Sequence, residues 1–145
     1  MILIDANLLL YAYDGTSARH AAARAWLENV FSSPEPVGLS WITLLAFLRV
    51  GTDPRAVRRP LSPADASAIV GTWLQRPNVT ILQPTERHWS VLTRLLTDGQ
   101  ARGPLVMDAD LAALAIEHGA TLCTVDRDFG RFPGLTVVNP LDAAG

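Results

Sequence analysis

The sequence contains no lysine: all twelve of its basic side chains are arginine, against fourteen acidic ones, and the formal net charge is −2. A chain without a basic excess lacks the uniformly positive surface that grips long stretches of duplex nucleic acid. Its only cysteine, Cys123, cannot form an internal disulfide. No apolar run approaches the roughly 20 residues that a membrane-spanning helix needs, and the chain opens on a strand pattern without a secretory leader. These absences predict a cytoplasmic protein without a membrane anchor.

Other kinds of site are also missing. The sequence has no glycine-rich phosphate-binding loop. His20, His88 and His118 are scattered without the spacing of metal ligands, so each is expected at the surface or partly packed. A phosphatase with an aspartate nucleophile is disfavoured, because that chemistry usually needs a second Asp two residues after the first, and Asn7 stands there after Asp5.

The remaining composition is that of one globular domain spanning residues 1–145, with 49% hydrophobic residues. Strand patterns alternate with helical patterns, which predicts a three-layer α/β/α sandwich around a mainly parallel central sheet. The predicted strands cover residues 2–5, 79–82, 121–125 and 135–138. The predicted helices are 7–13, one capped by Thr16 or Ser17, one capped by Ser40, one capped by Ser62, one opened by Thr85, and one from Asp108 to Gly119.

Four aspartates stand where predicted strands should give way to helices. Asp5 closes the first apolar run, Asp108 opens an alanine-rich segment, and Asp126 and Asp128 follow the strand pattern that includes Cys123. Each one alone reads best as a helix cap or a turn residue. Together they predict a metal site, because ligands bind outside the carboxyl ends of parallel strands and gathered carboxylates attract a hard cation such as Mg²⁺ or Mn²⁺.

Three blocks of sequence carry a resemblance to a known family. They are Leu3-Ile-Asp-Ala-Asn7, Asp108-Ala-Asp-Leu-Ala-Ala-Leu-Ala-Ile-Glu-His-Gly, and Thr124-Val-Asp126-Arg-Asp128-Phe129 with its tail Arg131-Phe-Pro-Gly-Leu. In order and spacing they resemble the PIN-domain nucleases and, among these, the VapC-type toxins of bacterial toxin–antitoxin pairs. The resemblance covers essentially the whole chain and implies a PIN-like fold.

The resemblance also implies a chemistry. Asp5, Asp108 and Asp126 match the acids that bind Mg²⁺ or Mn²⁺ in this family, where the metal activates a water that attacks an RNA phosphodiester and leaves a 3′ hydroxyl and a 5′ phosphate. Asp128 matches a further acid. Asn7 and Thr124 match polar neighbours with orienting roles, although Thr124 can also be read as a buried strand residue with a satisfied hydroxyl. The implied partners are an RNA substrate (tRNA, rRNA or mRNA), a VapB-like antitoxin and a second copy of the chain.

One position departs from the family pattern. Many PIN domains carry a Glu in the third helix, and Ala46 stands in its place here. The loss leaves the number of metal ions open and keeps an alternative alive, a non-catalytic PIN-like module that binds RNA or a protein partner. Asp110 is a poor substitute, since a residue two positions from Asp108 on a helix faces nearly the opposite way, and we expect it to face solvent. Arg49 lies on the face of Ala46. It reads either as a functional residue, which pairs with the acids or meets the scissile phosphate, or equally as a surface residue.

Two groups of residues allow both a structural and a functional reading. The tryptophans Trp26, Trp41, Trp73 and Trp89 fall on apolar helical stripes, which favours packing over base stacking, with Trp89 facing inward and Trp41 or Trp73 at a dimer interface. Arg49, Arg55, Arg58 and Arg59 cluster in sequence, as a solvated loop or as a nucleic-acid contact.

Overall fold

A five-stranded parallel sheet with the order β3-β2-β1-β4-β5 organises the molecule. The computed structural model describes residues 1–142. It confirms the four predicted strands, all shorter than expected, and adds one that the sequence did not reveal. The strands are β1 (Ile2–Ile4), β2 (Val37–Leu39), β3 (Val79–Ile81), β4 (Thr121–Cys123) and β5 (Val137–Val138).

The unpredicted strand is β2, which pairs with β1 on one side and β3 on the other. It is three residues long and has Gly38 at its centre, so neither its length nor its composition marks it as a strand. The glycine is required by close packing: a Cβ on Gly38 would lie 2.7 Å from Cδ1 of Leu82. The fold therefore uses at its middle a residue that weakens the strand signal.

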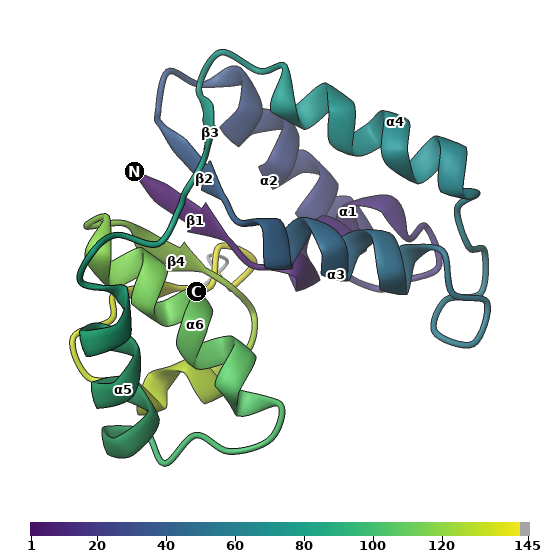
Figure 1. Cartoon of the computed structure of the whole chain (residues 1–145). Helices are drawn as coiled ribbons and strands as arrows, with labels where there is room; N and C mark the ends of the chain where they lie inside the picture. The colour runs from purple at the N-terminus through teal and green to yellow at the C-terminus, as the bar shows by residue number, and fades with distance from the viewer. Residues whose placement is uncertain (143–145) are drawn as a thin grey trace.

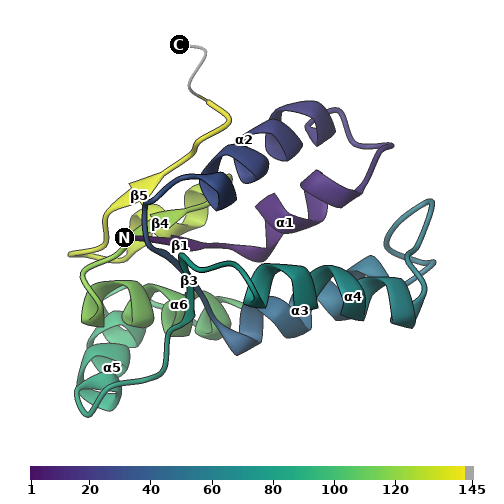
Figure 2. The same ribbon diagram turned by 90° about the horizontal axis from the view of Figure 1, so that it is seen from above.

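Helices cover both faces of the sheet, which confirms the three-layer sandwich (Figures 1 and 2). Helices α1 to α4 lie on one face, while α5, α6 and the short 3-10 helix η1 lie on the other. Within residues 1–142 no helix is long and apolar enough to span a membrane. The helices are α1 (Ala6–Tyr13), α2 (His20–Ser32), α3 (Trp41–Gly51), α4 (Pro63–Leu74), α5 (His88–Asp98), α6 (Leu105–Glu117) and η1 (Arg127–Arg131).

The alternation of side chains along the strands divides the core in two. Leu3 of β1 packs with α5 and α6, whereas its neighbour Ile4 packs with α1 to α4. The larger helical layer centres on Trp73, which is 2% exposed and lies 4.8 Å from Phe47 between ring centroids. Burial of Trp73 makes the expectation that it lies at a dimer interface wrong.

The helix starts follow the sequence predictions in two of five cases. Ser40 and Ser62 accept hydrogen bonds from the backbone N–H groups of Thr43 and Asp65, as predicted. Helix α2 instead begins after Arg19 without a side-chain cap, because Thr16 and Ser17 belong to the preceding turns. Helix α5 begins at His88 rather than near Thr85, and α6 begins at Leu105, three residues before Asp108.

The exposure of the other tryptophans separates packing from surface roles. Trp26 is half-buried, Trp41 is 51% exposed and Trp89 is 72% exposed. The expectation that Trp89 faces inward is therefore wrong. Helix α5 buries Val91 and Leu95, and Trp89 falls on the opposite side of this short amphipathic helix.

Candidate active site

Asp5 stands at the carboxyl end of β1 and is both a helix cap and a site residue. Its Oδ1 accepts a hydrogen bond of 2.7 Å from the backbone N–H of Ala6, which caps α1. Its Oδ2 accepts a hydrogen bond of 2.7 Å from the hydroxyl of Thr124, which follows β4. Burial raises the pKa of Asp5, against these two hydrogen bonds. The cap reading and the site reading are thus compatible, because each uses a different carboxylate oxygen.

Thr124 joins the polar residues of two neighbouring strands. Its buried hydroxyl donates to Asp5 and accepts from Asn7 Nδ2 at 3.1 Å and from the backbone N–H of Asp126 at 3.0 Å. Thr124 is thus a buried strand-end residue with a satisfied hydroxyl, as its structural reading predicted. The residues that satisfy this hydroxyl are themselves predicted site residues. Thr124 therefore holds Asp5, Asn7 and the start of the Asp126 segment in one arrangement.

Asp126 caps η1, with Oδ1 accepting from the backbone N–H of Asp128 at 2.9 Å. Asp126 is half-buried, whereas Asp128 is exposed. The short 3-10 turn turns the chain away from β4, so that both acids stay near the carboxyl edge of the sheet. Asp126 is close enough to Asp5 to raise the pKa of that carboxyl.

Asp108 approaches the same edge of the sheet from the first turn of α6. The sequence pattern had placed it at the end of a strand. Burial raises its pKa to about 6, and repulsion from Asp126, Asp5 and Asp128 adds to the rise. Only Arg131 acts in the opposite direction. The structure therefore brings all four predicted acids into one electrostatic environment with too little positive charge to balance them.

The residues at this edge suit a hard divalent cation. The candidate metal ligands are carboxylate oxygens. The Oδ1 of Asn7, a neighbour of Asp5 in sequence, is buried without a hydrogen-bond partner in residues 1–142. A buried orphaned acceptor is costly unless a bound water or ion satisfies it. Within residues 1–142, no three His, Cys, Asp or Glu side chains are grouped closely enough to hold a metal ion by themselves. A cation here would therefore take only one or two carboxylates from the protein and keep several waters, as Mg²⁺ does.

Comparisons with known proteins identify the family of this chain. The model of the PIN domain matches residues 2–135. Ribonuclease VapC37 of Mycobacterium tuberculosis is 43% identical over 135 residues, 93% of this chain and 94% of the relative. Ribonuclease VapC43 of the same organism is 40% identical over 142 residues, 98% of this chain and 97% of the relative.

This chain belongs to the PIN-domain family of VapC ribonucleases. Solved structures share the fold of this PIN domain at lower identity. VapBC2 from Rickettsia felis, bound to a DNA fragment of its promoter, has a TM-score of 0.69 at 22% identity and covers 96% of this chain and 98% of its own. The Mycobacterium tuberculosis toxin VapC20, which cleaves the sarcin-ricin loop, has a TM-score of 0.65 at 20% identity, covering 94% and 99%.

Ala46 and Arg49 lie on helix α3 of the PIN domain. With Ile42, Leu45 and Met107 they line an open cavity of about 470 Å³ between α3 and α6. Arg49 is exposed and forms no salt bridge within residues 1–142. The cation nearest the acids is instead Arg131, which donates to the carbonyl of Asp128 at 3.3 Å and to that of Gly99 at 3.0 Å. Its place three residues after Asp128 is the signal that could have identified it.

Asp110 does not face solvent, so that expectation is wrong. Its carboxylate is 22% exposed and its Oδ1 lies 2.7 Å from Nε2 of His88. The other ring nitrogen of His88 contacts Glu117, whose side chain is fully buried and whose Oε1 also accepts from the N–H and hydroxyl of Thr85. Carboxylates only accept hydrogen bonds, so His88 donates from both nitrogens as an imidazolium. Burial opposes this charge, but the two hydrogen bonds outweigh it and raise the pKa of His88.

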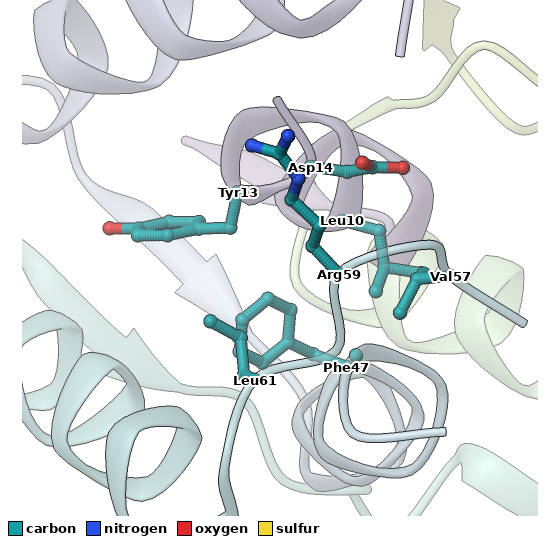
Figure 3. Close-up of a pocket in the computed structure, with 8 residues that line it drawn as sticks. Leu10, Tyr13, Asp14, Phe47, Val57, Arg59 and Leu61 are labelled. Carbon is teal, nitrogen blue, oxygen red and sulfur yellow. The ribbon is translucent and has the colours of Figure 1, made fainter. Parts of the chain in front are cut away.

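The arginine cluster divides between α3 and the loop that follows it. Arg55, Arg58 and Arg59 are exposed in this loop, and Arg55 pairs with Asp53 at 3.4 Å. Figure 3 shows Arg59 at the rim of a crevice between α1, α3 and the loop. The crevice measures about 10 Å³, room for about one water, so it is a packing seam rather than a ligand site.

Proposed function

We propose that this PIN-domain protein is a Mg²⁺-dependent endoribonuclease. The observation that carries the proposal is the mutual repulsion of Asp5, Asp108 and Asp126 at one sheet edge, where Asn7, whose buried Oδ1 lacks a partner in residues 1–142, is linked to Asp5 through Thr124. Mg²⁺, or Mn²⁺ in its place, would be held by these three carboxylates, directly or through water. When bound, it would lower the pKa of a water molecule and neutralise charge on the phosphate.

The other residues of the site position and tune this constellation. Thr124 fixes one oxygen of Asp5 and the backbone N–H of Ala6 fixes the other, so the carboxylate cannot rotate freely. Asn7 is held through its Nδ2 and can accept a hydrogen from a water with its Oδ1. Asp128 adds negative charge at the edge of the site. Arg49, which is exposed on α3, would meet an RNA phosphate.

The proposed biological role is that of the toxin in a toxin–antitoxin pair in the cytoplasm. Its relatives are named ribonuclease VapC, and structural neighbours include VapBC complexes. A cognate VapB-like antitoxin would inhibit it by placing a basic side chain among the acids, since unpaired carboxylates are a ready receptor for arginine. Its substrate would be a tRNA, rRNA or mRNA.

The proposed homodimer uses the apolar patch formed by Ile42, Leu45, Val106 and Met107. These side chains are between 37% and 58% exposed and lie together on α3 and α6, with Trp41 at the end of the patch. Replacing Leu45 with Glu should convert the dimer to a monomer, because it places a charge in a dehydrated interface. Light scattering measures the mass. Leu74→Glu, at an exposed apolar residue of α4, is the matched control, and a wild-type monomer at high concentration would exclude the dimer.

The experiment that tests the nuclease is cleavage of total tRNA and rRNA with Mg²⁺, Mn²⁺ or a chelator. Asp5→Asn keeps the size of the side chain but weakens metal binding, and it should abolish the discrete fragments without unfolding the protein. Glu35→Gln is the matched control, because Glu35 is an exposed acid just before β2, at the opposite edge of the sheet. An Asp5→Asn protein as active as wild type would refute the mechanism.

Ala46 supports a second candidate function, a non-catalytic module that binds RNA or a protein partner through the same acids. The same assay separates the two. Folded protein that binds these RNAs but cuts none of them, with either metal, would favour the binding module.

A further inference from the structure

A second cavity opens at the carboxyl edge of the sheet, next to the ends of β2 and β3. It measures about 170 Å³ and lies between the start of α3, the segment after β3, and α6. Because β3 and β2 precede β1 and β4 in the order of the sheet, this cavity continues the edge that carries Asp5 and Thr124. Its main lining residues are Ser40, Trp41, Leu82, Gln83, Asp110 and Leu114.

The charged group in the wall of this cavity is the carboxylate of Asp110. His88 fixes its Oδ1 at 2.7 Å, and the 22% exposure of the side chain leaves acceptor capacity toward the cavity. A carboxylate has two oxygens with about four acceptor positions, so one bond to His88 does not saturate it. A carboxylate in a confined space repels phosphate and selects groups that donate N–H. The cavity is therefore suited to a base rather than to the backbone of a nucleic acid.

The rest of the wall suits a flat apolar ring. Trp41 is 51% exposed at the rim, and Leu82 and Leu114 are apolar. Unpaired RNA bases are bound by stacking on aromatic side chains together with hydrogen bonds to their edges. An exposed tryptophan next to a fixed carboxylate supplies both parts of this recognition.

The cavity adjoins the larger one between α3 and α6. Ile42 lines both, and Met107, which lines the larger one, directly precedes Asp108. Asp110 follows Asp108 by two residues, so its carboxylate faces another side of the helix. An RNA strand bound at Asp108 would reach the cavity past Met107 and Ile42.

We propose that this cavity binds one guanine base of the RNA substrate next to the cleaved bond. The proposal rests on the proposed nuclease function and gives it a sequence preference. Guanine presents two adjacent donors, N1–H and the N2 amino group, which match the two oxygens of a carboxylate. Adenine and cytosine each present an amino group beside an acceptor nitrogen, and uracil presents one donor between two acceptors, so a carboxylate repels part of each edge.

The test is cleavage of a random 12-nucleotide RNA library followed by sequencing of the fragment ends. Wild-type protein should enrich guanine at one position near the cut, and Asp110→Asn should reduce this enrichment about tenfold, the order expected from one specific base contact. Inosine lacks the N2 amino group. An oligonucleotide with inosine at that position should be cut about tenfold more slowly than the guanosine version by wild type, and equally by Asp110→Asn.

A control separates base recognition from support of α6. His88→Gln disturbs the same hydrogen-bond network, but His88 does not line the cavity. It should lower stability, and with it the cleavage of all sequences, while keeping the difference between guanosine and inosine. If His88→Gln removes this difference as fully as Asp110→Asn does, or if wild type cuts without preferring guanine, the proposal is overturned.

A binding measurement separates failure of this proposal from failure of the nuclease function. Asp5→Asn protein is titrated with guanosine 5′-monophosphate and inosine 5′-monophosphate, and quenching of tryptophan fluorescence is followed with and without Trp41→Phe. Stronger quenching by the guanosine nucleotide, lost in Asp110→Asn and in Trp41→Phe, supports the cavity even if no RNA is cut. Equal quenching by both nucleotides, or none because a second copy covers Trp41, overturns it.

Discussion

Two sides of helix α6 hold their carboxylates in opposite ways. Near its start, Asp108 faces Asp5, Asp126 and Asp128 with only Arg131 in opposition, and its pKa rises to about 6. Farther along, Asp110 and Glu117 share one charged histidine, and hydrogen bonds from Thr85 and His88 lower the pKa of Glu117 against the effect of burial.

This difference distinguishes a candidate ligand site from a cluster with a structural role. Like charges in a partly buried place lower the stability of the fold, and such an arrangement persists where a ligand compensates for it. A carboxylate matched by a histidine and a hydroxyl needs no further partner. Glu117 therefore belongs to the structure that positions α6, while the cluster around Asp108 is the proposed reaction site. Asp110 lies between the two, held by His88 on one side and open to a cavity on the other.

We call Asp110, Glu117, His88 and Thr85 the compensated cluster, because the charge of His88 balances the carboxylates. The largest effect on stability should come from removing one of its members. Glu117→Ala leaves Thr85 and the imidazolium of His88 without their buried acceptor, and removing one partner of a buried ion pair costs about 3 kcal/mol. Urea denaturation measures the loss in free energy of unfolding. Adding His88→Leu should recover part of this loss, since the charge left behind is then removed. A Glu117→Ala protein as stable as wild type would mean that the cluster contributes nothing.

The fold class and the positions of Asp5 and Asp126 at strand ends were predictable from the sequence because they depend on local patterns. Short apolar runs followed by aspartate marked β1 and β4, and both Asp5 and Asp126 follow these strands as predicted. The strand β2 was missed because Gly38 must fit beneath Leu82, a demand set by a residue 44 positions away along the chain.

The compensated cluster was not predictable for a related reason. His88 lies on α5 and its two acceptors lie on α6, 22 and 29 residues later, so no spacing in the sequence brings them together. The one signal available was that Asp110 and Glu117, seven residues apart, share a face of α6. Helical geometry alone had excluded Asp110 from the Asp108 face, and this part of the expectation agrees with the structure.

Removing one carboxylate from the uncompensated cluster of Asp5, Asp108, Asp126 and Asp128 should have a smaller effect, an increase in stability. In metal-free protein Asp108→Asn removes a carboxylate whose folded-state pKa, about 6, exceeds the ordinary value of 3.8. A raised pKa means that the folded state binds the proton more tightly, so wild type loses stability as the pH rises from about 4 through 6 and the variant does not share this loss. Below pH 4 the two proteins should be alike. Above pH 7 the variant should be more stable by on the order of 1 kcal/mol, after allowance for solvent screening.

Urea denaturation between pH 4 and pH 8, with chelator or with Mg²⁺, measures this difference, and Asp110→Asn on the same helix is the matched control. The control should lose stability at neutral pH, because it gives up the charge that His88 requires. Mg²⁺ should stabilise wild type and abolish the advantage of Asp108→Asn, because a bound cation replaces the missing positive charge. If the stability of wild type and of Asp108→Asn depends on pH in the same way, the acids do not repel one another. The distinction between the two sides of α6 would then fail.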